Sequence, residues 1–168
     1  MSKNSLIRCL IILIILVNAC SKSDENSVTP TNEVVNGINK SNMLNLINSY
    51  RSTGCNCGTV KMPAVAKLIW NDKLGVSANK HTTDMASNNY FSHTSKDGRT
   101  MSDRIKAEGY SGSTLGENIA MGQTSEKQVI ESWINSPGHC ANIMNGSFTD
   151  VGFARSQNYW TQNFGRSK

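Results

Sequence analysis

The chain has 168 residues, which is enough for one domain with a sizeable apolar core. It carries 17 Lys and Arg against 12 Asp and Glu, a formal net charge of +5. The basic residues form neither a cluster nor a basic helix face, which argues against a nucleic-acid-binding protein. The sequence also has no internal repeat and no glycine-rich loop of the kind that cradles phosphate.

Residues 1–19 are predicted to be an export signal. Lys3 and Arg8 make a basic start, and residues 9–17 are an unbroken apolar run, too short to span a bilayer as a mature helix. Small Ala19 comes directly before Cys20, so the segment resembles a bacterial lipoprotein signal. The resemblance implies cleavage before Cys20 and acylation of its sulfur and of the new terminus, palmitate being one such chain. The alternative is ordinary secretory cleavage that leaves Cys20 free.

Residues 20–40 are predicted to be a lipidated, flexible tether. They are rich in Ser, Asn, Thr and acidic residues and nearly free of large apolar side chains, so they cannot bury enough surface to fold. We therefore expect a domain over residues 41–168, held on a membrane through Cys20 because buried acyl chains bind the bilayer. The expected location is the cell envelope, facing the periplasm or on the surface of the outer membrane, and not the cytosol.

Two amphipathic helices are predicted in the first half of the domain. Ser41 is the candidate cap of the first helix, and Gly54 ends it. Its apolar stripe consists of Met43, Leu46, Ile47 and Tyr50. Asn71 or Asp72 opens the second helix. Its stripe consists of Leu74, Ala78, His81 and Met85, so His81 is expected to be a buried structural residue.

The second half is predicted to alternate helices and strands. A loop containing His93 precedes a short helix that Thr100 or Ser102 caps and Gly109 closes, and residues 115–120 form a strand with Glu117 at its start. Ser125 and Gln128 make a capping box for a helix over residues 126–135. Residues 148–155 and 159–164 alternate like the strands of a hairpin.

His139 is predicted to lie on a rigid turn. The preceding helix is stopped at Ser136, because Pro137 lacks a backbone donor and disfavours helical dihedrals in the residue before it. Gly138 can take a positive φ. Such a turn suits a site residue, although a histidine at a helix start can equally be structural.

His93, His139 and Glu117 are the candidate metal-binding residues. Two neutral imidazoles with a carboxylate or water suit Zn²⁺ or a similar divalent ion, and no HExxH motif joins them. A hydrolase would also need a nucleophile. Ser92 and Ser136 lie beside these histidines, but neither is in a G-x-S-x-G elbow.

Three cysteines remain after the predicted signal and acylation site: Cys55, Cys57 and Cys140. One disulfide and one free thiol is the simplest arrangement in an oxidising compartment. A bond between Cys55 and Cys57 would close a tiny, strained loop. We therefore expect Cys140 to pair with Cys57 or with Cys55, a bond typically worth about 2–4 kcal/mol. A nucleophilic pair made of His139 and Cys140 is the alternative, but adjacent residues at a helix start point in different directions.

Taken together, these motifs resemble those of the CAP superfamily, named after cysteine-rich secretory proteins, antigen 5 and pathogenesis-related 1 proteins. The resemblance covers about residues 41–165. It is carried, in chain order, by Leu-Ile-Asn at 46–48, Trp-Asn at 70–71, Asp-Met-Ala at 84–86, Phe-Ser-His at 91–93, Gly-Glu-Asn-Ile-Ala at 116–120, Ser-Pro-Gly-His at 136–139 and Val-Gly-Phe at 151–153.

The resemblance implies an α+β fold, an α-β-α sandwich with a small antiparallel sheet between helices. It also implies a cleft lined by His93, His139 and Glu117, with Glu117 as a third ligand or as a partner that orients an imidazole. Ser136 stands where eukaryotic members carry a second glutamate. Cys140 replaces a family arginine, which favours a lineage-specific disulfide, Cys57–Cys140 or Cys55–Cys140.

No general reaction is established for this family, some members of which bind metals and others lipids or sterols. We therefore expect a module that binds a small molecule, a lipid or an envelope ligand in a cleft able to hold Zn²⁺ or another divalent cation. The competing hypothesis is a zinc-dependent hydrolase acting on peptides or envelope polymers.

Overall fold

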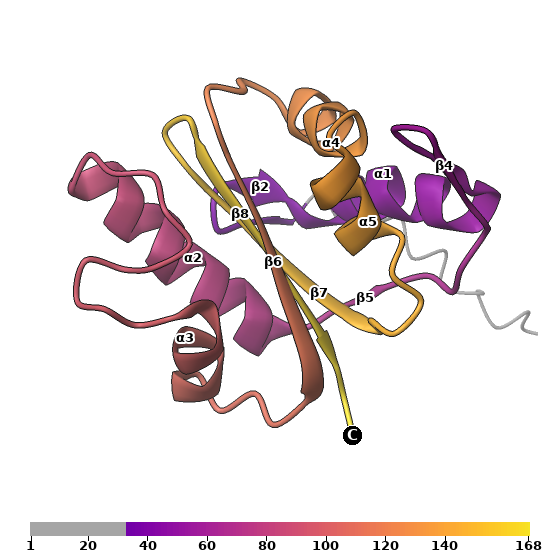
Figure 1. Cartoon of the computed structure of the whole chain (residues 1–168). Helices are drawn as coiled ribbons and strands as arrows, with labels where there is room; N and C mark the ends of the chain where they lie inside the picture. Colours follow the sequence, from indigo (N-terminus) through magenta and orange to yellow (C-terminus); the bar gives the residue numbers. More distant parts are fainter. Residues whose placement is uncertain (1–32) are drawn as a thin grey trace, which may run out of the picture.

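The structure is a computed structural model and describes residues 33–168 (Figure 1). The predicted signal peptide and the acylation site Cys20 lie outside these residues. None of the helices that are described combines the length and the apolar character needed to cross a membrane.

A four-stranded sheet forms the middle of the molecule, with its strands in the order β5-β7-β8-β6. The strands are β5 (Ile69–Trp70), β6 (Ser113–Met121), β7 (Asp150–Ser156) and β8 (Tyr159–Arg166). Strands β6, β8 and β7 are antiparallel, and the short β5 runs parallel to β7. Strands β7 and β8 form the predicted hairpin, and β6, which carries Glu117, is an edge strand. Glu117 lies in the middle of β6 and not at its start.

Helices cover both faces of this sheet, which confirms the predicted α+β sandwich (Figure 1). On one side lie α2 (Asp72–Ser87) and α3 (Met101–Ala107), and on the other lie α1 (Lys40–Thr53), α4 (Glu126–Ile134) and α5 (Pro137–Ile143). Strands β7 and β8 are buried on both faces because both faces are covered, so polar and apolar residues alike are shielded from water along them.

Helix α2 follows its predicted pattern closely. The side chain of Asn71 caps it by accepting from the backbone N–H groups of Lys73 and Leu74. All four residues of the predicted stripe, His81 included, are buried. The helix approaches β7 at two glycines: a Cβ built on Gly152 would overlap the backbone nitrogen of Gly75. This close approach fixes α2 against the sheet.

The folded part begins before residue 41, so the prediction of a tether up to residue 40 is wrong for its last residues. Strands β1 (Val34–Val35) and β2 (Ile38–Asn39) form a hairpin that leads directly into α1. Ile38 is only 1% exposed and belongs to the main core. Asn39, and not Ser41, caps α1, with its side chain 2.9 Å from the Asn42 nitrogen. Ile38, together with the partly buried Val35 that packs against the same core, anchors this segment.

Two further segments differ from the sequence-based expectation. After α1, β3 (Cys55–Cys57) and β4 (Val60–Met62) form an antiparallel hairpin that the sequence analysis did not predict. The turn expected at His139 is the first turn of α5, with Pro137 at its start. Proline is well suited to that position because the first helical N–H groups have no partner within the helix.

Candidate ligand-binding cleft

His93 lies in the loop between α2 and α3 and is held by Glu117 of strand β6. The His93 Nδ1 atom is 2.8 Å from Glu117 Oε1. The two side chains differ sharply in exposure: that of His93 is 57% exposed and that of Glu117 only 2%. A buried carboxylate thus orients an accessible imidazole, and this leaves Nε2 as the nitrogen of His93 that a ligand can use.

The other carboxylate oxygen of Glu117 is bound by Arg104 of helix α3. The Arg104 guanidinium lies 2.6 Å from Glu117 Oε2, and it also donates to the carbonyl oxygen of His93 at 2.9 Å. Arg104 therefore fixes both Glu117 and the backbone of the histidine that Glu117 orients. Both Glu117 oxygens are engaged, which is the geometry of a positioning residue.

Arg104 is a site residue that the sequence analysis did not single out. Its position in the sequence indicated that it would be buried. It lies three residues after Met101 and directly before Ile105, on the inner face of the predicted helix. Ile105 is fully buried and Arg104 is buried with it. A buried arginine needs an anionic or carbonyl partner, so its place on that face pointed to a buried acid.

His139 is oriented in a similar way from the other side of the sheet. Its Nδ1 atom is 2.9 Å from Ser136 Oγ, three residues earlier. The side chain of Asn118, on β6, donates to the His139 carbonyl oxygen at 3.2 Å. Glu117 and Asn118 are neighbours on the edge strand, so His93 and His139 are each tied to β6 through one of them.

The environment of His139 disfavours its charged form. Burial lowers the pKa of His139 below its usual value, and the charge of His93 lowers it further. Glu117 does not join them as a ligand set: among residues 33–168, the one group of three or more potential ligands with mutually close donor atoms consists of cysteines.

His81 supports the loop that carries His93. It is 1% exposed, and its Nε2 atom lies 2.9 Å from the carbonyl oxygen of Ser92, the residue before His93. Burial lowers the pKa of His81, which favours its neutral form. These observations fit the structural role predicted for it.

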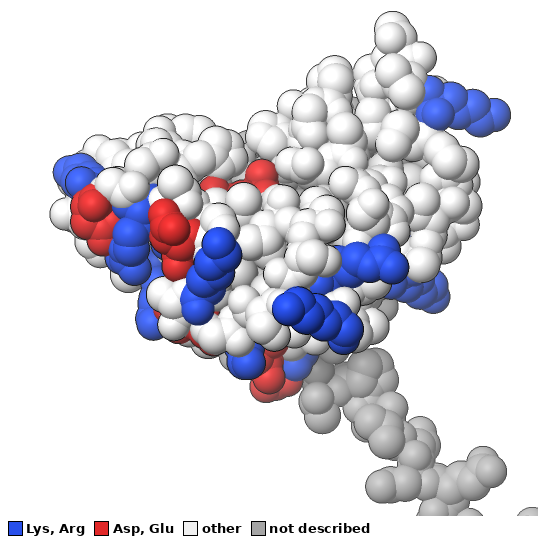
Figure 2. Space-filling model, turned by 60° about the horizontal axis from the view of Figure 1, so that its bottom comes forward, with Lys and Arg blue, Asp and Glu red and all other residues white. Residues whose placement is uncertain are grey.

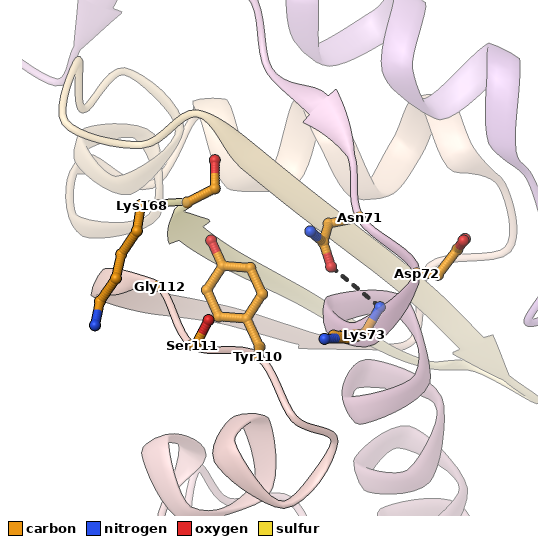
Figure 3. A pocket seen from close by; sticks show the side chains of 8 residues that line it. Asn71, Asp72, Lys73, Tyr110, Ser111, Gly112 and Lys168 are labelled. Atoms are coloured by element: carbon orange, nitrogen blue, oxygen red, sulfur yellow. Dashed lines mark hydrogen bonds between the residues drawn. The ribbon is translucent and has the colours of Figure 1, made fainter.

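A cavity of about 270 Å³ opens beside the His93–Glu117 pair, and it continues over the start of α3 at Thr100, Met101 and Ser102. A larger pocket, of about 360 Å³, lies elsewhere (Figure 3). Its wall is formed by the start of α2, residues 110–112 and the C-terminal residues, and it contains none of the predicted site residues. Size alone therefore does not mark the site that the histidines define.

Charged side chains surround one end of the molecule. Figure 2 shows acidic and basic side chains side by side at the end occupied by α2 and α3. Lys80 and Glu108 form one such pair at 2.7 Å, and Asp97 and Arg99 form another at 2.7 Å. Because the Lys80 side chain is 63% exposed, the Lys80–Glu108 pair is expected to add at most about 1 kcal/mol.

The structure pairs Cys57 with Cys140 and leaves Cys55 as a free thiol. Of the two pairings that the sequence left open, it thus selects Cys57–Cys140. The bond spans 83 residues and joins β3 to α5, directly after His139. It therefore fixes the helix that carries one side of the cleft.

Comparisons with known proteins agree with this architecture. The profile of the cysteine-rich secretory protein family, CAP, matches residues 44–164. The uncharacterized protein YkwD of Bacillus subtilis is 42% identical over 96 residues, which are 56% of this chain and 37% of that protein. The uncharacterized membrane protein YlbC of the same organism is 37% identical over 100 residues, 60% of this chain and 29% of that protein. The match thus spans only about a third of either relative.

The fold is also found in solved structures. An extracellular protein containing an SCP domain from Bacillus anthracis superposes with a TM-score of 0.68 and 31% identity, over 76% of this chain and 40% of that one. An outer surface protein from Borrelia burgdorferi gives a TM-score of 0.64 at 22% identity, over 76% of this chain and 92% of that one.

Proposed function

Because the chain belongs to the cysteine-rich secretory protein (CAP) family, we propose that it is an extracytoplasmic binding module whose ligand enters the cleft at His93 and His139. One observation carries this proposal: each imidazole is held through Nδ1 by a protein side chain, Glu117 in one case and Ser136 in the other. The Nε2 nitrogen of each ring is left for a ligand. Orientation of two accessible rings from behind is the arrangement expected of a binding site.

Neutral imidazole nitrogens such as these two Nε2 atoms are ligands that a divalent ion such as Zn²⁺ prefers. His93 and His139 would hold the ion, and a bound ion would act as a Lewis acid toward an oxygen of the ligand. Glu117 would position His93, because its two oxygens are already bound to His93 and Arg104. A site with two protein ligands keeps open positions for a ligand from solution.

We also propose that the domain is held in the cell envelope through an acylated Cys20. Two observations support this location: one relative is named a membrane protein, and one structural neighbour is described as extracellular. Fractionation of cells that express Cys20→Ser tests the anchor. The variant is expected in the soluble or uncleaved fraction, and an acylated, membrane-bound Cys20→Ser protein would contradict the proposal.

Ligand-dependent thermal shifts test the binding function. The full chain is screened in detergent against lipids, glycans and peptides, with and without Zn²⁺, beside the variant His93→Ala/His139→Ala. A ligand is expected to raise the melting temperature of the wild type and not that of the variant, since binding to the folded state stabilises it. If the Zn²⁺-loaded protein instead turns over a peptide or envelope polymer, and His139→Ala abolishes that turnover, the chain is a hydrolase and the binding-module proposal is wrong.

A further inference from the structure

Three cysteine sulfurs lie together at the junction of strand β3 and helix α5. The Sγ atoms of Cys55, Cys57 and Cys140 all lie within 4.8 Å of one another. Cys57 and Cys140 are bonded, and the free Cys55 Sγ is 3.7 Å from Cys140 Sγ. We call these three residues the cysteine cluster.

The elements that carry the cluster are joined by more than the disulfide. Arg51, near the end of α1 and four residues before Cys55, is fully buried. Its guanidinium donates to the carbonyl oxygen of Ile143 at 2.6 Å and to that of Phe148 at 3.3 Å. Arg51 thus ties the helix that precedes β3 to the end of α5. Cys57 and Cys140 are also part of the main apolar core. Reduction of the bond should therefore leave the three sulfurs near one another.

The spacing of the sulfurs suits a metal ion. In a tetrahedral site with Zn–S bonds of about 2.3 Å, two thiolate sulfurs lie about 3.8 Å apart. Cys55 and Cys140 already have this separation, and an opened Cys57–Cys140 pair needs to separate by only a small distance to match it. We propose that reduction of the Cys57–Cys140 disulfide converts the cysteine cluster into a three-thiolate site for Zn²⁺ or a similar thiophilic ion, so that metal binding depends on redox state.

The conversion requires a reductant first and a metal ion second. A dithiol reductant gives two electrons and two protons to the Cys57–Cys140 bond and becomes a disulfide itself, which leaves Cys57 and Cys140 as thiols. The ion then replaces the protons of Cys55, Cys57 and Cys140, which pass to solvent, and water or an outside ligand takes the fourth position. In the reverse direction, a small-molecule disulfide takes two electrons from the Cys57 and Cys140 thiolates and two protons from solvent and becomes a dithiol, which re-forms the Cys57–Cys140 bond, removes two of the three thiolates and releases the ion.

Cys55 is the point of entry. It is partly exposed, whereas Cys57 and Cys140 are buried. In the oxidised protein, burial raises the pKa of the Cys55 thiol, so it carries its proton at neutral pH and is a poor ligand by itself. A protonated thiol does not attack a disulfide, so Cys55 can remain free beside the Cys57–Cys140 bond in the oxidised protein.

Cobalt spectroscopy tests the proposal. The full chain carries Cys9→Ser and Cys20→Ser, so that Cys55, Cys57 and Cys140 are its only cysteines. It is reduced with a phosphine in detergent without oxygen, the reductant is removed, and Co²⁺ is added. The reduced protein is expected to bind one Co²⁺ at the cysteine cluster with thiolate-to-cobalt charge-transfer absorption, and Zn²⁺ is expected to remove that absorption. The oxidised protein is expected to show no such absorption.

Variants separate the cysteine cluster from the cleft. Cys55→Ser keeps the disulfide partners and should bind Co²⁺ about tenfold more weakly or worse, with weaker charge-transfer absorption, because one thiolate is lost. His93→Ala/His139→Ala should keep the charge-transfer absorption of the parent. Equal binding by Cys55→Ser, or absent charge-transfer absorption in the reduced parent, would overturn the proposal. Circular dichroism checks the fold, and a reduced chain that is unfolded before Co²⁺ is added would also overturn it.

Discussion

Arg104 and Glu117 form an ion pair of 2.6 Å whose side chains are only 4% and 2% exposed. Few ion pairs among residues 33–168 have both charged side chains so completely shielded from solvent. The pair connects helix α3 to strand β6, and the second oxygen of Glu117 continues the chain of contacts to His93. The packing of the domain and the orientation of the cleft histidine therefore depend on the same carboxylate.

Replacement of that carboxylate should be costly. Glu117→Gln keeps the shape of the side chain but leaves the Arg104 charge buried without its counter-ion, so we expect it to lower the free energy of unfolding by about 3 kcal/mol or more. Glu131→Gln is the matched control, because Glu131 pairs with Lys127 at 3.6 Å on the surface. It should change stability by less than about 0.5 kcal/mol. Urea unfolding measures both, and equal costs would show that the buried pair does not stabilise the fold.

The approach of α2 to β7 predicts a strong contrast between two glycines. Gly152→Ala places a methyl group against the backbone of Gly75, so the helix or the strand must move, and we expect a loss of about 3 kcal/mol or failure to fold. Gly138→Ala adds a methyl group to α5 where no atom lies within 4 Å, and it should be neutral or slightly stabilising. Thermal unfolding of the two variants compares them. A Gly152→Ala protein as stable as the wild type would contradict the close packing.

The cleft predicts a pH dependence with a definite sign. The pKa of His139 is lowered, chiefly by burial and secondarily by His93. Below the usual histidine pKa of about 6.5, the unfolded chain therefore binds more protons at this residue than the folded chain does. Its stability contribution is complete above about pH 6.5 and is lost as the pH falls below it. His81 acts in the same direction, since its pKa is also lowered.

Proton NMR titration of the metal-free protein tests this directly. We expect the His139 resonance to titrate below pH 6.5 in the wild type. In His93→Ala the pKa of His139 should rise but stay below that value, because burial persists when the neighbouring charge is gone. No change in His93→Ala would show that the two rings lie too far apart to form one site.

The parts of the fold that depend on local sequence were predictable. Helix α2 follows from the cap at Asn71 and the spacing of its apolar residues, and the hairpin around Gln157 and Asn158 follows from two alternating segments with a polar turn. The family motifs placed His93 in a loop and Glu117 on a strand. In each case the information lies in residues that are close in sequence.

The contacts that hold the cleft together were not predictable, because they join distant segments. Arg104 and Glu117 meet only when α3 packs beside β6. Likewise, the place of Ile38 in the core depends on where α1 and the sheet leave room for it. The choice of Cys57 over Cys55 as the partner of Cys140 depends on which side of the β3 hairpin faces the core, and a short segment with two cysteines does not reveal that.

Calorimetric titration of Zn²⁺ into the oxidised protein tests the cleft most directly. The full chain carries Cys9→Ser, Cys20→Ser and Cys55→Ser, so the remaining cysteines are in the disulfide and cannot bind the ion. We predict one Zn²⁺ per chain at pH 7.5, weaker binding at pH 5.5 because protons compete for the imidazoles, and no binding when His93→Ala and His139→Ala are added. Equal Zn²⁺ binding by the histidine variant, or none by its parent, would show that the cleft is not a metal site.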